Sequence, residues 1–319
     1  MARMAAGEFS RARPAVPARH QLSKVPEVTV FFWITKVLTT GMGEATSDYL
    51  VHRFSPQIAV VLGFVAFAAA MTLQFVVRRY VTWIYWLAVA MVAVFGTMAA
   101  DVLHVGLHIP YWASTTFYAI VLTVIFIAWY RSQGTLSIHS IYTRRRETFY
   151  WATVLATFAL GTAAGDWTAR DTGLGYLGSG IMFLVVIAVP AVAYWRFGMN
   201  AIAAFWFAYI VTRPLGASFA DWLAWPRSIG GLGVGHGLVS AYSTIIIIGF
   251  VAYMTITRQD VVGRPATSGQ PGSGADLRPG LADRSSQGGR HRRAGEPSRD
   301  WHADGRAGRA VRDSVDGQV

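Results

Sequence analysis

The stretch WATVLATFALGTAAGD, residues 151–166, decides how the chain folds. It is an apolar run of membrane-helix character, and it ends on Asp166, although acids are expensive inside a membrane. The same spacing, a tryptophan, nine residues, a glycine, four residues and an aspartate, occurs four times. Its acidic ends are GEATSD (43–48), GTMAAD (96–101), GTAAGD (161–166) and GASFAD (216–221). Four copies of so long a pattern indicate internal duplication.

Three sets of equivalent residues follow from this pattern. The motif tryptophans are Trp33, Trp86, Trp151 and Trp206; the motif glycines are Gly43, Gly96, Gly161 and Gly216; the repeat aspartates are Asp48, Asp101, Asp166 and Asp221. When the long apolar segments of the chain are numbered in order, each copy of the pattern lies in an odd-numbered segment, and an even-numbered segment without the pattern follows it. Because each pair of segments would cross a membrane twice, we expect all four copies to have the same orientation.

The composition indicates a membrane protein, since 53% of the 319 residues are hydrophobic and only 14% are charged. A membrane-spanning helix needs about 20 mostly apolar residues. Eight segments meet this need: 28–51, 57–77, 80–103, 111–130, 147–168, 178–196, 199–223 and 237–257. We therefore predict an all-α polytopic membrane bundle of eight transmembrane helices in four parallel two-helix repeats. The repeats cover about 25–79, 80–146, 147–198 and 199–257.

The segments outside this transmembrane domain, residues 25–257, differ from it in composition. Residues 1–24 carry basic groups and no apolar signal-peptide core, which predicts a basic cytoplasmic arm. Residues 258–319 are rich in Gly, Ser, Pro and Arg, which predicts a disordered cytoplasmic tail. Arginines gather in alternate connections, at Arg78, Arg79 and 144–146, and this bias places both termini in the cytoplasm.

The stretches KVPEVTVFFWITKVLTTGMGEATSDYL (24–50) and FWFAYIVTRPLGASFADWL (205–223) resemble a family of bacterial multi-spanning proteins. That family is built from a short membrane repeat of unknown function, and its members are labelled membrane-anchored proteins. The resemblance covers residues 24–257 and implies a multi-pass protein of the bacterial cytoplasmic (inner) membrane. It implies no activity, so the function has to be argued from the residues.

The repeat aspartates allow two interpretations. At 1.5 Å per residue, about 22 Å separate each tryptophan from its aspartate, which places the aspartates near the outer boundary of the membrane. A carboxylate at a helix C-terminus is unfavourable by about 0.3–1 kcal/mol, so it needs a compensating partner. In the structural interpretation, each aspartate accepts hydrogen bonds from nearby loop amides, and each glycine allows close helix packing. In the functional one, the four acids line a common polar cavity and hold a cation or a shared proton.

Three charged residues occur in one copy only. Lys36, Glu44 and Arg213 lie at positions where the other copies have uncharged residues. Lys36, Thr40, Glu44 and Asp48 recur every fourth residue and form a slowly winding polar stripe. Ionisable groups at this depth are candidates for function. Alternatively, Lys36 and Arg213 form neutralising ion pairs with nearby acids.

Other site chemistries find little support. His104 and His108 have helical i, i+4 spacing beside Asp101, a weak signal for a metal site. The chain has no cysteine, and no P-loop, GxGxxG or GxSxG motif. The tail arginines alternate with acids, unlike a nucleic-acid-binding patch. We therefore expect no enzyme activity, no cofactor and no nucleic-acid partner.

Two functions remain. The first is transport of a small solute or cation, coupled to protons, along a path lined by the repeat aspartates with Glu44, Lys36 and Arg213. The second is a scaffold or sensor that does not transport and acts through the tail, with purely structural aspartates. The expected partners are the lipid bilayer and a small cation or proton, and the sequence indicates no particular oligomeric state.

Overall fold

The computed structural model describes residues 23–102 and 106–261, and over these residues it contains eight α-helices and no strand. The helices are α1 (Val30–Arg53), α2 (Pro56–Val76), α3 (Thr82–Asp101), α4 (Tyr111–Gln133), α5 (Arg144–Asp166), α6 (Gly175–Phe197), α7 (Ala201–Ala224) and α8 (His236–Thr257). The all-helical prediction is confirmed. The expected basic arm and disordered tail lie outside the described residues, apart from residues 23–24 and 258–261.

Local sequence signals explain where the helices begin and end. The side chains of Thr29, Ser55 and Thr143 accept hydrogen bonds from backbone amides in the first turns of α1, α2 and α5. At the other ends of α4 and α6, Gly134 and Gly198 adopt φ values of 71° and 65°. Glycine reaches this left-handed region without strain, which lets the chain reverse tightly.

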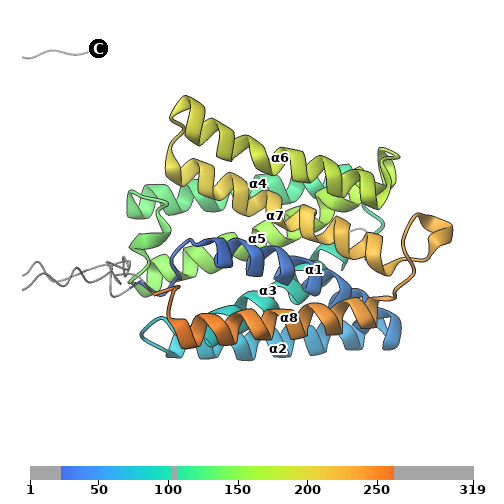
Figure 1. Ribbon diagram of the computed structural model, residues 1–319, viewed down its shortest axis with the longest axis horizontal. Coiled ribbons are helices and arrows are strands. Elements are labelled where there is room, and N and C mark those ends of the chain that lie inside the picture. The colour runs from blue at the N-terminus through green and yellow to red at the C-terminus, as the bar shows by residue number, and fades with distance from the viewer. Residues whose placement is uncertain (1–22, 103–105, 262–319) are drawn as a thin grey trace, which may run out of the picture. The chain divides into compact units, whose positions relative to one another are not determined.

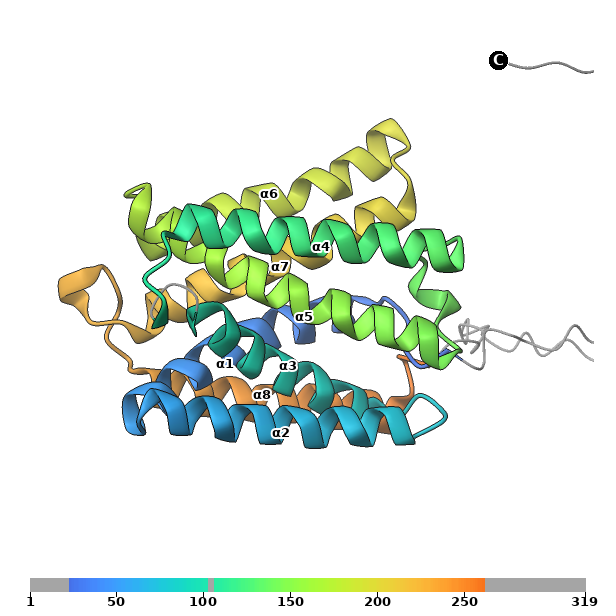
Figure 2. The same cartoon turned by 180° about the vertical axis from the view of Figure 1, so that it is seen from behind.

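The four odd-numbered helices form an inner group, and the even-numbered helices flank it. Figures 1 and 2 show α1, α3, α5 and α7 in the middle, with α4 and α6 on one side and α2 and α8 on the other. In the apolar stretches of α3 and α7, 67% and 56% of the residues are buried, against 17–28% in the four outer helices. The outer helices therefore present the apolar surface that a bilayer would cover.

The helices close into a ring with pseudo-fourfold order. Each inner helix contacts the next one: α1 packs on α3, α3 on α5, α5 on α7, and α7 on α1. Each outer helix packs on the inner helix of the following copy, so that α2 lies on α3, α4 on α5, α6 on α7, and α8 returns to α1. The last contact joins the fourth copy to the first and closes the bundle.

An aromatic layer repeats around this ring. The residue before each motif tryptophan is also aromatic, and it contacts the tryptophan of the next copy. The four pairs, with ring centroids 5.6–6.2 Å apart, are Phe32–Trp86, Tyr85–Trp151, Tyr150–Trp206 and Phe205–Trp33. Such pairs contribute about 0.5–1.5 kcal/mol each beyond the area they bury. The tryptophans of the motif are therefore contacts between copies.

The motif glycines form a second layer of equivalent contacts. A Cβ on each glycine would collide with one particular residue of the next copy, which lies seven positions after that copy's tryptophan. The four pairs are Gly43–Ala93, Gly96–Phe158, Gly161–Arg213 and Gly216–Thr40. The glycines thus bring adjacent inner helices close together, as small residues do in membrane proteins.

Six of the eight helices are long and apolar enough to cross a membrane, namely α2, α3, α4, α6, α7 and α8. The expectation of eight such segments is therefore met only in part. Polar residues explain the difference: Lys36, Glu44 and Asp48 lie within α1, and α5 has a charged first turn, Arg144–Glu147, and Thr153, Thr157 and Thr162 along the rest of its length. The described chain is a helical membrane protein with an internal repeat.

We predict that Gly43→Val destabilises the protein, because its side chain would overlap Ala93 on α3. Overpacking of this kind costs on the order of 1–3 kcal/mol. The matched control is Gly249→Val in α8, where a Cβ would meet nothing within 4 Å. Thermal unfolding of both variants in detergent measures the difference. Equal melting temperatures would show that close packing at the glycine layer does not stabilise the ring.

Candidate functional site

The centre of the ring holds a fully buried arginine. Arg213 of α7 has no solvent-exposed surface, and its Nη2 donates to Glu44 Oε2 of α1 at 2.5 Å. The same nitrogen donates to the hydroxyls of Thr97 on α3 and Thr162 on α5, the latter at 2.6 Å. One guanidinium therefore joins all four inner helices. An unpaired charge at this depth would be strongly unfavourable, and the carboxylate and hydroxyls compensate it.

The partners of Arg213 occupy equivalent positions in the repeat. Glu44, Thr97 and Thr162 each follow a motif glycine directly, and the fourth copy has Ala217 there. Because the ring has pseudo-fourfold order, these positions converge on its axis, and a single cation can reach three of them. Arg213 is itself equivalent to Thr40, Ala93 and Phe158. The charged core thus arises because one copy has a glutamate at the first set of equivalent positions and another copy has an arginine at the second set.

Lys36 lies in α1 one helical turn before Thr40, the residue equivalent to Arg213. It is also buried, with 1% of its surface exposed. Its ammonium lies over the rings of Phe158 and Tyr209, 4.1 and 4.2 Å from their centroids. Within the described residues Nζ makes no hydrogen bond or ion pair. The ion pair expected as an alternative therefore holds for Arg213, whereas Lys36 is stabilised by aromatic faces.

Three carboxylates come together toward the end of the ring that carries the repeat aspartates. Glu44, Asp48 and Asp221 can each offer a carboxylate oxygen within 4.8 Å of the other two. His236 of α8 lies beside Asp48, with Nδ1 3.3 Å from Oδ2, but this nitrogen makes no hydrogen bond within the described residues. Asp221 is 5% exposed, and its Oδ1 has no hydrogen-bond partner among the described residues. We call Glu44, Asp48 and Asp221 the acid cluster.

The other two repeat aspartates lie at the same end of the ring. Asp166 forms an ion pair of 3.5 Å with Arg170, one turn later in the chain. Arg170 Nη1 also donates to the hydroxyl of Tyr111 at 2.9 Å. Burial alone would lower the pKa of Arg170, but the negative charge of Asp166, helped by that of Asp221, raises it above the ordinary value. Asp101 and Asp166 are also near enough to Asp48 for their charges to interact with it.

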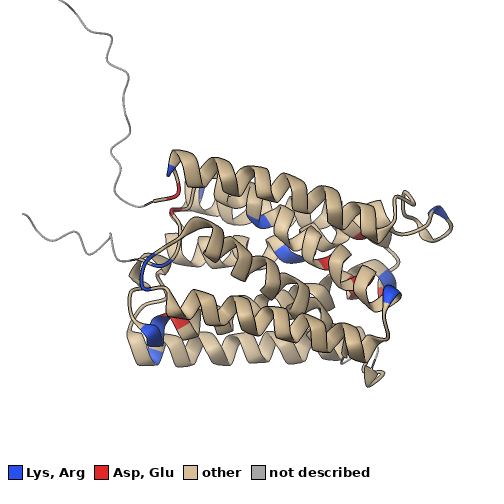
Figure 3. Ribbon diagram, turned by 90° about the horizontal axis from the view of Figure 1, so that it is seen from below, with Lys and Arg blue, Asp and Glu red and all other residues tan. Residues whose placement is uncertain are grey.

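The repeat aspartates therefore differ in their surroundings. Asp48 and Asp221 come together with Glu44, as the common-cavity interpretation expects. Asp166 forms an ion pair with Arg170 of the same copy, a side-chain partner where the structural interpretation expects loop amides. Figure 3 shows charged residues toward both ends of the bundle and a few between them, while the sides of the bundle are uncharged.

A second polar group, not expected from the sequence, closes the opposite end. Lys24 is buried and donates to Glu147 Oε2 at 2.6 Å, and Gln74 donates to the other oxygen of Glu147 at 3.2 Å. Farther into the ring, the hydroxyls of Tyr85 and Tyr150 are 2.6 Å apart. Because Lys24 and Glu147 are 123 residues apart, no local pattern links them.

The proposed histidine site is not assembled in the described residues. His104 lies outside them. His108 is exposed, follows the end of α3 outside any α-helix, and has a φ of 56°. The helical face that would align the two histidines is therefore absent at His108. The scaffold hypothesis depends on the tail, which lies outside the described residues beyond Val261, and it stays a prediction.

These features define a class: a helical membrane protein made of four homologous hairpins around a polar axis. The chain belongs to the family described as Repeat of Unknown Function (DUF347), which matches at residues 31–80, 84–135, 149–200 and 204–260. The match confirms the resemblance to a repeat family and places one repeat on each helical hairpin. No curated protein and no solved structure matches the chain.

We predict that Glu44 and Arg213 are energetically coupled. Arg213→Met leaves the carboxylate of Glu44 buried without its cation, and Glu44→Met leaves the guanidinium without its anion. Each single change should lower stability by about 3–5 kcal/mol, whereas the double variant should lose clearly less than the sum of the two.

Denaturant or thermal unfolding in detergent measures all three variants. Arg227→Met, at an exposed loop position, serves as a control for loss of an arginine and should leave stability nearly unchanged. Strictly additive losses would mean that the two side chains act independently.

Proposed function

We propose that the protein transports a small cation along the axis of the ring and exchanges it for protons. The acid cluster supports this proposal most directly. Three carboxylates share one small volume, while Arg213 supplies one positive charge to Glu44 and His236 accompanies Asp48. Like charges at this distance raise the free energy of the empty, ionised site, and a bound cation or a proton lowers it.

The chemistry of the acid cluster favours a hard cation. Carboxylate oxygens are the ligands that Mg²⁺, Ca²⁺ and Mn²⁺ prefer, and the imidazole of His236 lies beside them. Cation binding needs ionised carboxylates, so it releases protons. This linkage supplies a chemical basis for exchange: a protonated cluster and a cation-bound cluster are the two compensated states of the site.

The deeper cations then act as a barrier. A positive ion that leaves the acid cluster along the axis meets Arg213 and then Lys36, both fully buried. Fixed positive charges exclude cations from a pore, so the pathway does not leak at rest. Passage requires the Arg213–Glu44 bond to open and Lys36 to lose its proton or move. Lys36 contacts only aromatic faces, so a change in its charge breaks no hydrogen bond or ion pair within the described residues.

We further infer that all eight helices cross the inner membrane, with both termini in the cytoplasm. Lys36 and Glu44, which make α1 less apolar, lie near the ring axis and are covered by neighbouring helices. The exposed Arg144 and Arg145 lie at the end of α5. Polar groups at membrane depth are tolerated in this position, because they face protein and not lipid. The arginine distribution supports this orientation, in which the acid cluster opens to the outer side.

Asp221→Asn tests the proposal. The change removes one charge and keeps the shape of the side chain, and Asp221 Oδ1 has no hydrogen bond to lose within the described structure. We expect cation flux into proteoliposomes to fall at least tenfold, while the melting temperature stays equal or rises. Asp171→Asn, at an exposed position on the same side, should keep the flux of the parent protein.

The measurement follows uptake of Mg²⁺, Ca²⁺, Mn²⁺, Na⁺ and K⁺ together with internal pH. If the parent protein moves none of these ions, or if Asp221→Asn moves them at the parental rate, the proposal is wrong. If flux occurs without any change of internal pH, transport stands but proton exchange does not.

A further inference from the structure

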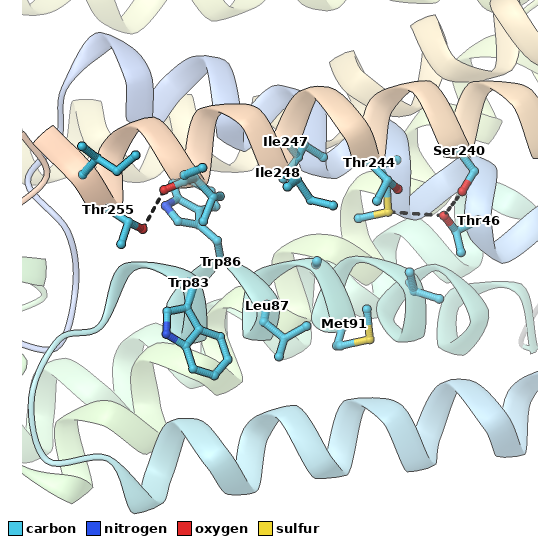
Figure 4. A pocket seen from close by; sticks show the side chains of 16 residues that line it. Thr46, Trp83, Trp86, Leu87, Met91, Ser240, Thr244, Ile247, Ile248 and Thr255 are labelled. Atoms are coloured by element: carbon cyan, nitrogen blue, oxygen red, sulfur yellow. Dashed lines mark hydrogen bonds between the residues drawn. The ribbon is translucent and has the colours of Figure 1, made fainter. Parts of the chain in front are cut away.

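A long apolar groove runs between α3 and α8 on the outer surface of the bundle. Its volume is about 680 Å³. Figure 4 shows that side chains of α3 and α8 form its two walls, with Thr46 of α1 at one end. The lining residues include Trp83, Leu87, Ala90, Ile248, Ala252 and Ile256.

The hydroxyl groups along the groove do not make it polar. Thr46 and Ser240 bond to each other at 2.6 Å, and Thr255 donates to the carbonyl of Val251 at 2.7 Å. Three of the four lining hydroxyls thus bond within the protein, and only Thr244 has no such bond among the described residues, so the groove offers a ligand mainly methyl groups and aromatic surface. A flexible hydrocarbon chain fits such a surface, since the groove lies on a face that a bilayer would cover.

Three arginines lie at the Trp83 and Ile256 end of the groove. Arg78 and Arg79 precede α3, and Arg258 follows α8 directly. All three are exposed, and none forms an ion pair with another described residue. This end is therefore basic, and the groove combines an apolar wall with a positively charged rim.

A buried acid holds the two arginine-bearing segments together. Asp260 Oδ2 accepts hydrogen bonds from Tyr80 at 2.5 Å and from Thr82 at 2.8 Å. Burial and the adjacent carboxylate raise the pKa of Tyr80, so it stays a neutral donor. Asp260 is 1% exposed. Its charge is therefore used inside the protein, whereas the arginines remain available at the surface.

We propose that this groove binds an anionic phospholipid, with an acyl chain between α3 and α8 and the phosphate headgroup at Arg78, Arg79 and Arg258. The dimensions agree. One leaflet is about 15 Å thick, half of the hydrocarbon core, which corresponds to about ten helical residues. An acyl chain that starts at Ile256 thus reaches the level of Ile247, well within the groove. Trp83 lies at the headgroup level, where tryptophan is favoured.

The charge of the headgroup distinguishes this proposal from general lipid contact. Basic residues near an anionic membrane surface are attracted to its headgroups. Zwitterionic lipids with the same chains could fill the groove but would gain little from the three arginines. A free phosphate could contact the arginines but would gain nothing from the groove.

The experiment measures thermal unfolding of the full chain in neutral detergent with added lipid. Phosphatidylglycerol should raise the melting temperature by several degrees, phosphatidylcholine with identical chains by clearly less, and inorganic phosphate not at all. The triple variant Arg78→Gln, Arg79→Gln, Arg258→Gln should lose the preference for phosphatidylglycerol. Arg227→Gln, at an exposed position on the opposite side, should keep it.

A second variant tests the groove itself. Ala252→Trp fills it from α8 and should abolish stabilisation by phosphatidylglycerol. Ile245→Trp, an exposed position on α8 outside the groove, is its control. The arginine variant changes only exposed side chains and decides the matter if Ala252→Trp fails to fold. Equal stabilisation by both lipids, or the same effect from inorganic phosphate alone, would overturn the proposal.

Discussion

The hydrogen bonds of Arg213 are the interaction on which the centre of this structure depends. A guanidinium in the middle of a membrane bundle has no water to solvate it, and Nε of Arg213 has no hydrogen-bond partner among the described residues, so the charge depends on acceptors for the terminal nitrogens. Glu44, Thr97 and Thr162 provide them from the three other inner helices. This requirement fixes the distance of all four helices from the axis. It also explains why the glycine layer lies beside it, because only close-packed helices bring these acceptors within reach of one side chain.

The ring has pseudo-fourfold order, and its chemistry departs from that order. Contacts that build the ring recur in every copy: the aromatic pairs, the glycine contacts, and the packing of each outer helix on the following inner helix. The charged core residues occur once each. Contacts between copies therefore do not need Lys36, Glu44 or Arg213. Three threonines or valines at the same layers would pack without the desolvation penalty of buried ions. Replacing a whole buried ion pair by packed apolar residues is often neutral or stabilising, although removing one partner alone is costly. Packing therefore does not account for these charges, and for this reason they point to function.

Much of the fold could be predicted from the sequence, because duplication makes the pattern visible four times. The spacing of tryptophan, glycine and aspartate indicated four equivalent helices with one orientation, but not that these helices form the inner group. The closing contact of α8 with α1 could not be predicted, since it joins the two ends of the repeat array. The aromatic residue before each motif tryptophan is visible in the sequence as a further repeated feature. Its role became clear only when the ring showed that it reaches the next copy.

The candidate site could also be predicted only in part. Depth and rarity indicated Lys36, Glu44 and Arg213, but their partners could not be inferred: Glu44 and Arg213 are 169 residues apart. Lys36 illustrates the limit best. Charge alone favoured an acidic partner for it, yet the nearby acid is already bound to Arg213, the stronger and more rigid hydrogen-bond donor. Lys36 is left with two aromatic faces, which stabilise an ammonium but do not prevent it from losing a proton. The arginine thus links the four inner helices by hydrogen bonds, whereas the lysine makes no hydrogen bond or ion pair among the described residues that a change of its charge would break.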